Sequence, residues 1–289
     1  MINIKVSQNF LHNPRTVNKI VGLSNISKED VVLEIGPGKG IITDALSKKA
    51  KHVIAIEYDK GLYNNLVEKK FENVSIYNMD FLKYNFNYNQ NIKIFSNIPF
   101  NLTTEIFNKL IENYKYIDDF YLIMQEETAY RFLGNPYCME TSKSLLYKPI
   151  YEGKIIFNFI KTDFYPIPNV KIVLVHYHKK TYSDIKNNDI YTYLDFISYL
   201  YINNTSFKDA TSNIFTFEQQ KKIRKDLNID WNKNITSLRY EQWIKIYNSY
   251  INYASEGSKK TVKGSYKRTI SKQKSISKMH NPNKKRHIY

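Results

Sequence analysis

Residues 31–40 read "VVLEIGPGKG", an apolar run that leads directly into a turn with three glycines. The run has the length and composition of a buried strand, and the residues after Gly40 have helical spacing. Glycines let backbone amides and a helix N-terminus approach a ligand closely, as nucleotide-binding turns do. The stretch therefore predicts a strand, a ligand-binding turn and a helix at the start of an α/β fold.

More apolar runs follow, separated by segments with helical spacing. They are "HVIAI" (52–56), "VSIYNM" (74–79), "IKIF" (92–95) and "FYLIM" (120–124). A helix is also expected at about 14–21, where Asn13 can cap and Pro14 suits the first turn. Strands that alternate with helices imply crossover connections and a mainly parallel sheet covered on both faces.

The pattern changes after about residue 180, where apolar and aromatic residues recur three and four apart. We predict a catalytic domain at 1–180, a smaller all-helical domain at 181–254 and a tail at 255–289. The tail holds eleven Lys and Arg residues and one acid, so it carries +10 of the chain's net charge of +16.

Its few apolar residues cannot repay the entropy of ordering, so the tail is expected to be disordered and to bind nucleic acid phosphates. No amphipathic face accompanies the charges, and this argues against a membrane. The alternative is a solubilising tail in a chain that is rich in lysine throughout.

The single cysteine, Cys138, excludes an intramolecular disulfide and a cysteine-based zinc site. The histidines lack ligand spacing, and the pair in "HYH" (176–178) has no third ligand evident in the sequence, so we predict no metal site. The N-terminus lacks a signal-peptide apolar region, and no run is long enough to span a membrane. A cytoplasmic protein is expected.

Acidic residues end the next two predicted strands. Glu57 follows the glycine turn by about twenty residues, where a carboxylate can accept hydrogen bonds from both ribose hydroxyls of an adenosine ligand. Asp80 can accept from an adenine amino group, and Phe81 supplies an apolar wall. The turn alone could be structural or serve NAD, but its spacing is not G-x-G-x-x-G. S-adenosylmethionine suits the set, because it has an adenosine and no pyrophosphate.

The fourth predicted strand runs into "FSNIPFN" (95–101). The Asn97 side-chain oxygen and the Ile98 carbonyl can accept both hydrogens of an adenine amino group and so free its lone pair for a methyl group. Pro99 would fix the backbone, and Phe100 would stack on the base, a contact worth about 1–3 kcal/mol. The alternative makes Asn97 a turn residue, Pro99 a helix start and Phe100 a core residue.

Five motifs resemble, in order and spacing, the rRNA adenine N6-methyltransferases, and among these the erythromycin-resistance (Erm) methylases. They are "SQNFL" (7–11), "EIGPGKG" (34–40), "IEYD" (56–59), "MDFL" (79–82) and "NIPFN" (97–101). "MQEETAYRFLG" (124–134), "FYPIPNV" (164–170) and "YEQWIKIYNSY" (240–250) extend the resemblance over about residues 5–254.

The resemblance implies a Rossmann-like S-adenosylmethionine-dependent domain followed by a helical rRNA-binding domain, in a monomer without a metal or an obligate protein partner. The activity implied is transfer of one or two methyl groups to one adenine in the peptidyl-transferase region of 23S rRNA. Such a modification blocks macrolide, lincosamide and streptogramin B binding.

The resemblance also assigns residues to two groups. The cofactor-binding group consists of Gln8, Asn9, Leu11, Gly36, Gly38, Glu57, Asp80, Phe81 and Asn97. The group that holds the target base consists of Asn97, Ile98, Pro99 and Phe100. Family members often have Tyr where Phe100 stands, and Phe keeps the stacking.

Two other functions remain open at this point. One is that of the housekeeping 16S rRNA dimethyladenosine transferases, whose motif usually has Leu at the position of Ile98. The other is a methyltransferase-like RNA-binding factor without catalysis, against which the intact acids and aromatic residues speak.

Overall fold

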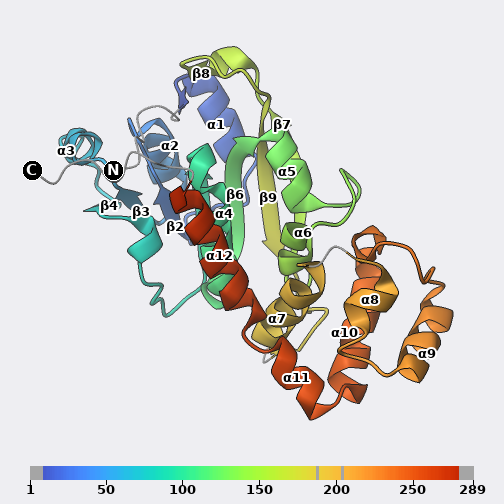
Figure 1. Ribbon diagram of the computed structural model, residues 1–289. Helices are drawn as coiled ribbons and strands as arrows, with labels where there is room; N and C mark the ends of the chain where they lie inside the picture. The colour runs from blue at the N-terminus through green and yellow to red at the C-terminus, as the bar shows by residue number, and fades with distance from the viewer. Residues whose placement is uncertain (1–8, 187–188, 203–204, 280–289) are drawn as a thin grey trace, which may run out of the picture. The chain divides into compact units, whose positions relative to one another are not determined.

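The computed structural model describes residues 9–186, 189–202 and 205–279 (Figure 1). The chain divides into two compact units. A sheet unit consists of the described residues of 9–130 and 151–181, and a helical unit consists of those of 131–150 and 182–279. Residues 131–150 therefore belong to the helical unit, although the sequence placed them in a catalytic domain at 1–180.

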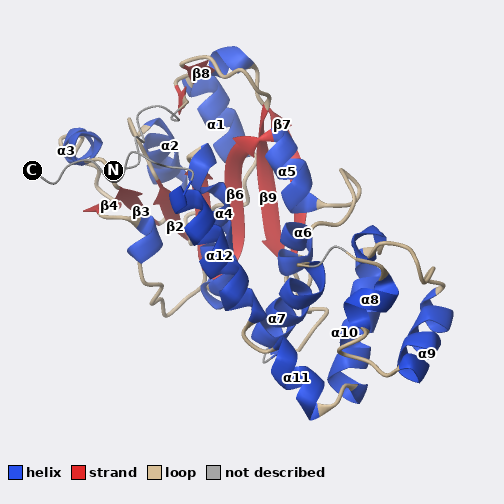
Figure 2. Ribbon diagram, in the orientation of Figure 1, coloured by secondary structure: helices blue, strands red, loops and turns tan. Residues whose placement is uncertain are grey.

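The sheet unit is built on a seven-stranded sheet with the order β4-β3-β2-β5-β6-β9-β7 (Figure 2). The first five strands in this order are parallel, whereas β9 runs antiparallel to both β6 and β7. The strands are β2 (Val31–Ile35), β3 (His52–Glu57), β4 (Val74–Asn78), β5 (Ile92–Asn97), β6 (Ile117–Gln125), β7 (Tyr151–Asn158) and β9 (Ile172–Lys179). The predicted, mainly parallel sheet is confirmed.

Helices cover both faces of this sheet. On one face, buried residues of α1 (Pro14–Gly22) and α2 (Ile41–Lys49) share a core with Phe95 and Tyr121. On the other face, Phe107 of α4 (Thr103–Glu112) packs its ring edge-on against Phe120 at 6.1 Å. Neighbouring residues of one strand point to opposite faces, so Phe120 and Tyr121 serve different cores.

The remaining elements of the chain's first 181 residues are short. They are β1 (Phe10–Leu11), α3 (Lys60–Val67), α5 (Glu126–Leu133), α6 (Ser142–Tyr147), β8 (Phe164–Tyr165) and the 3-10 turns at Phe81–Lys83, Phe100–Leu102, Tyr114–Tyr116 and Lys161–Asp163. Side chains cap the starts of several helices, and the cap at Asn13 was predicted from the sequence. The side chain of Asn13 accepts from the Arg15 amide ahead of α1, and that of Asp59 accepts from the Leu62 amide ahead of α3.

The helical unit has an aromatic core. Its main helices are α7 (Ile190–Tyr201), α8 (Phe207–Thr211), α9 (Phe217–Leu227) and α10 (Tyr240–Tyr253), with a 3-10 turn at Ile235–Ser237. Tyr193 of α7 meets Tyr247 of α10 edge-on at 5.0 Å, and its hydroxyl donates to the Leu145 carbonyl at 2.9 Å. The helical character predicted for this region is confirmed. No described helix is both long enough and apolar enough to span a membrane.

The prediction of a disordered tail from residue 255 is wrong for its described part. Residues 256–279 form α11 (Glu256–Val262) and α12 (Ser265–Met279). Asp195 of α7 caps the start of α12, because its carboxylate accepts from the Gly264 amide at 2.7 Å and the Tyr266 amide at 2.9 Å. Val262 and Tyr266 are buried. Residues 280–289 lie outside the described residues.

Candidate functional site

The glycine turn joins β2 to α2 and forms one side of a cleft in the sheet unit. Gly36 and Gly38 have φ values of +66° and +59°, which L-residues with a side chain rarely adopt. A Cβ atom added at Gly38 would lie only 3.0 Å from the ring of Phe10, whereas one at Gly36 would meet nothing within 4 Å. Gly36 therefore leaves open space beside the backbone, as a ligand that lies against the turn requires.

Glu57 is the last residue of β3, and its side chain is hydrogen-bonded to the glycine turn. Its carboxylate oxygens accept hydrogen bonds from the Gly38 amide at 3.0 Å and the Asp59 amide at 2.8 Å. The side chain is buried, and burial raises its pKa although the two amide bonds oppose the rise. Each oxygen has two lone pairs, so Glu57 can also accept from ligand hydroxyls.

Glu34 is a second buried carboxylate at the turn, and the sequence analysis gave it no role. It is 1% exposed, and its Oε2 atom has no hydrogen-bond partner among the described residues. Burial, with the nearby Glu57 charge adding to it, raises the pKa of Glu34 to about 8. Its position inside "EIGPGKG" was the available signal, since a polar residue in an apolar run is unusual.

Asn97 ends β5 on the other side of the cleft. Its Nδ2 atom donates to the backbone carbonyl of Asn9 at 3.0 Å, and this bond assigns the Oδ1 atom as the acceptor end of the amide. Ser96, just before it, is buried and donates its hydroxyl to the Ile35 carbonyl at 2.6 Å. The end of β5 is thus tied to both the N-terminal segment and the end of β2.

The residues after Asn97 turn into a short 3-10 helix. The Leu102 amide donates to the Pro99 carbonyl at 2.9 Å and closes this turn. Ile98 has a buried side chain, whereas Phe100 is half-buried and lines the cleft. Phe100 also packs against the core of the sheet unit, so the alternative in which it is a core residue stays open beside its place in the cleft.

The N-terminal motif and "FYPIPNV" meet in the small sheet. Phe10 and Leu11 of β1 pair antiparallel with Tyr165 and Phe164 of β8. Asn9 donates from its side chain to the Pro166 carbonyl at 2.6 Å. This pairing positions the backbone carbonyl to which Asn97 donates. Gln8, the other predicted residue of the motif, lies outside the described residues.

Most predicted site residues line one cleft of about 590 Å³, a volume that includes its opening to solvent. The lining residues are Asn9, Phe10, Leu11, Gly36, Pro37, Gly38, Lys39, Ile41, Ile42, Asn97, Ile98, Pro99 and Phe100. The sequence analysis missed the apolar wall made by Phe10, Ile41 and Ile42. Among the described residues of this lining, Lys39 is the only titratable one, and the others offer hydrogen-bond acceptors and apolar surfaces.

Glu57, Asp80 and Phe81 are not among the described residues that line the cleft, although Glu57 is hydrogen-bonded to the glycine turn that does. Asp80 caps the 3-10 turn after β4 by accepting from the Leu82 amide at 2.9 Å. Phe81 is buried beside Tyr84 and Phe86. Both follow β4, which pairs in parallel with β3, and the Met79 amide just before them donates to the Glu57 carbonyl at 3.0 Å. Their contact with an adenine stays a prediction.

Known proteins with sequences similar to this chain are described as ribosomal RNA methyltransferases. A family model described as "Ribosomal RNA adenine dimethylase" matches residues 1–252. A Mycoplasma mobile protein named ribosomal RNA small subunit methyltransferase A is 33% identical over 229 residues, which cover 78% of this chain and 89% of that protein. A Streptococcus sanguinis protein named rRNA adenine N-6-methyltransferase is 32% identical over 253 residues, covering 86% and 96%.

Among solved structures, the crystal structure of the 23S rRNA methyltransferase ErmE superposes with a TM-score of 0.73. It covers 84% of this chain and 100% of its own, at 19% sequence identity. At this identity the likeness shows the fold alone. The α/β fold predicted from the sequence, with its helical C-terminal part, is thereby confirmed.

Proposed function

The chain belongs to the ribosomal RNA adenine dimethylase family and is an S-adenosylmethionine-dependent rRNA adenine methyltransferase, and from this premise we propose that its target is one adenine in the peptidyl-transferase region of 23S rRNA. The resistance branch is favoured by Ile98 in "NIPF" and by the closing "YEQWIKIYNSY" at 240–250. Methylation there would block macrolide, lincosamide and streptogramin B binding. The protein would act as a monomer in the cytoplasm.

The glycine-turn side of the cleft suits the cofactor. S-adenosylmethionine, when bound, supplies an electrophilic methyl group. The open space at Gly36 and the acceptor oxygens of Glu57 match an amino-acid part and a ribose. Asn9 and Leu11, with Gln8, would border the methionine and the donor end. Asp80 and Phe81 would hold the adenine from the neighbouring strand.

The Asn97 side of the cleft suits the target base. The amino nitrogen of adenine is a poor nucleophile, because its lone pair is delocalised into the ring. Asn97 Oδ1 and the Ile98 carbonyl would accept its two hydrogens and favour a nitrogen with a free lone pair. Pro99 fixes the backbone that presents this carbonyl, and the half-buried ring of Phe100 is available to stack on a flipped base.

One observation carries this proposal: the bond from Asn97 Nδ2 to the Asn9 carbonyl. It leaves the acceptor end of the amide for a substrate amino group, in the cleft that the glycine turn also lines. The described residues on the Asn97 side of the cleft are neutral, and their acceptor oxygens suit methylation of an exocyclic amine.

The helical unit and the basic helices α11 and α12 are proposed to contact rRNA. Phe217 and Trp231 stack at 5.7 Å, with Lys221 over the first ring at 4.6 Å and Arg224 over the second at 5.5 Å. This arrangement holds two cations at the surface of α9. Three exposed lysines lie in this region: Lys260 on α11, Lys263 directly after α11, and Lys267 on α12. Such charges neutralise phosphates without reading sequence.

The second candidate target is an adenine of 16S rRNA. Relatives such as the Mycoplasma mobile and Mycoplasmopsis pulmonis proteins are named for the small subunit, and the second is 35% identical over 224 residues. Incubating the protein with labelled S-adenosylmethionine and unmethylated 23S or 16S rRNA separates the two. We expect label in 23S rRNA, at one adenine. Label only in 16S rRNA would overturn the proposed target, and no label despite RNA binding would favour the binding factor.

A further inference from the structure

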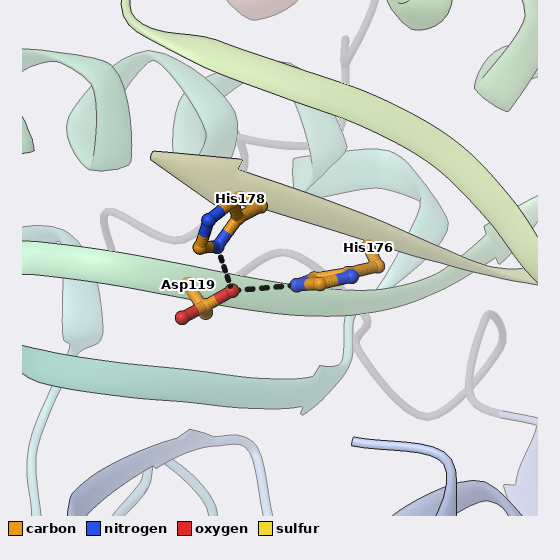
Figure 3. A group of neighbouring side chains, drawn as sticks. All are labelled: Asp119, His176 and His178. Atoms are coloured by element: carbon orange, nitrogen blue, oxygen red, sulfur yellow. Dashed lines mark hydrogen bonds and ion pairs between the residues drawn. The ribbon is translucent and has the colours of Figure 1, made fainter. Parts of the chain in front are cut away.

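Three potential metal ligands, Asp119, His176 and His178, lie close together on β6 and β9 (Figure 3). The Nε2 atom of His176 lies 2.6 Å from Asp119 Oδ1, and the Nδ1 atom of His178 lies 2.8 Å from the same oxygen. The sequence showed the two histidines of "HYH" without a third ligand. The register of β6 and β9 supplies it, because Asp119 pairs directly with His178.

We propose that Asp119, His176 and His178 bind one Zn²⁺ ion. Their ligand atoms all lie within 4.8 Å of one another, and imidazole nitrogens and a carboxylate oxygen are ligands that zinc prefers. Three protein ligands leave the fourth tetrahedral position to water.

Binding requires the side chains to rearrange. Zinc–ligand distances of about 2.0–2.2 Å imply ligand atoms about 3.3 Å apart in a tetrahedral site. The two nitrogen–oxygen distances, now 2.6 Å and 2.8 Å, would widen by about 0.5–0.7 Å, and the two imidazole nitrogens, which lie within 4.8 Å of each other, would have to take the same spacing. Each ring nitrogen that now faces the carboxylate would bind the metal, and its proton would move to the other ring nitrogen.

The surroundings hold these ligands in place. The Asn25 side chain donates to the other carboxylate oxygen of Asp119 at 3.1 Å, and the Tyr121 hydroxyl donates to Asn25 Oδ1 at 2.8 Å. The ring of Tyr121 stacks on His176 at 4.3 Å with an interplanar angle of 8°. Hydrogen bonds of this kind orient the ligands of natural metal sites.

The cluster is also accessible and separate from the catalytic chemistry. The side chain of His178 is 57% exposed, while those of His176 and Asp119 are 14% and 3% exposed. A metal can therefore enter from the His178 side. Asp119 is the third residue of β6, near its amino end, whereas the cleft lies at the carboxyl ends of β2 and β5. The ion would stabilise the β6–β9 pair rather than take part in methyl transfer.

The test measures zinc binding by untagged, full-length protein that has been stripped with a chelator. ZnSO₄ is added, unbound ion is removed by gel filtration, and bound zinc is counted by mass spectrometry. We expect one zinc per chain, and a thermal unfolding midpoint that rises with zinc concentration. Co²⁺ in place of zinc should give the visible absorption of a tetrahedral site.

Two variants locate the site. His178→Ala removes an exposed ligand, so the fold should survive, and zinc affinity should fall at least tenfold. Asn25→Ala removes an orienting bond and should lower affinity about 10-fold. His12→Ala, which removes an exposed histidine outside the cluster, should bind like the unchanged protein.

Near-ultraviolet circular dichroism confirms that each variant is folded. Equal zinc binding by His178→Ala and the unchanged protein would overturn the proposal, since the ion would then be held adventitiously elsewhere. Absence of stoichiometric zinc in the unchanged protein would also overturn it and leave a hydrogen-bonded Asp–His cluster.

Discussion

The glycine turn on one side of the cleft is held by backbone geometry and by the buried carboxylate of Glu57, whereas the opposite side depends on one side-chain amide and a partly buried ring. The turn, with Glu34 just before it in β2 and Glu57 hydrogen-bonded to it, is the side proposed to hold the methyl donor and is called the donor wall. Asn97–Phe100 form an acceptor wall that a single bond ties to Asn9. This difference implies that cofactor binding and base capture can be changed separately.

The largest effect is expected from Glu34, at the base of the donor wall. Its pKa of about 8 in the folded protein exceeds the ordinary value of 4.5, so the folded state holds a proton that the unfolded state releases. The stabilisation is complete below pH 4.5 and is lost as the pH rises towards about 8. A shift of this size corresponds to about 5 kcal/mol, as an order of magnitude.

Glu34→Gln keeps the shape and removes the charge. We expect its free energy of unfolding to exceed that of the unchanged protein at pH 8.5, with the gain shrinking towards pH 5. Urea unfolding at a series of pH values measures this difference. A difference that does not depend on pH would mean that Glu34 is ionised in the folded state.

Asn97→Ala should give the next largest effect, on the acceptor wall. Losing one preorganised hydrogen-bonding group at a reacting centre typically costs a factor of about 10²–10³ in rate. Cofactor affinity should fall by no more than about tenfold, the value of an ordinary hydrogen bond. Single-turnover methylation and calorimetric titration with S-adenosylmethionine measure the two quantities.

Glu57→Gln is the matched change on the donor wall. It should weaken cofactor binding by about tenfold or more while leaving the rate at saturating cofactor nearly unchanged. If the two variants lost rate and affinity in the same proportion, the walls would not be separable.

Phe100→Ala should have a smaller effect on the same acceptor wall. Loss of stacking worth about 1–3 kcal/mol lowers kcat/KM for RNA by about 5–150-fold. Phe100→Tyr keeps the ring and should stay active. Tyr182→Ala, which removes a ring that is 85% exposed and outside the cleft, is the control. Equal activity of all four proteins would remove Phe100 from the proposed mechanism.

The same contrast explains what could be predicted from the sequence. The donor turn and the Asn97 segment depend on backbone conformations that only certain residues satisfy, so short motifs reveal them. The place of Glu34 in "EIGPGKG" marked it as unusual, but its full burial depends on packing by neighbouring strands and could not be predicted from the motif. Asp119 was not predicted as a partner of the two histidines, because strand register, and not spacing along the chain, brings it next to His178. The helix α12 was not predicted, because the residue that caps it, Asp195, lies about seventy residues earlier in the sequence, in α7.

The smallest effect is expected outside both walls, from the exposed lysines of α11 and α12. Lys260→Ala, Lys263→Ala and Lys267→Ala combined should reduce the slope of log affinity for RNA against log salt by about 2, or about 0.7 for each lost phosphate contact. Fluorescence anisotropy with a labelled rRNA fragment measures this slope. The control replaces three exposed lysines of the sheet unit, Lys28, Lys51 and Lys115, by alanine, which lowers the net charge by the same amount. Because neither wall is altered, cofactor affinity should be unchanged. Equal salt slopes of RNA affinity for the two triple variants would mean that only net charge matters.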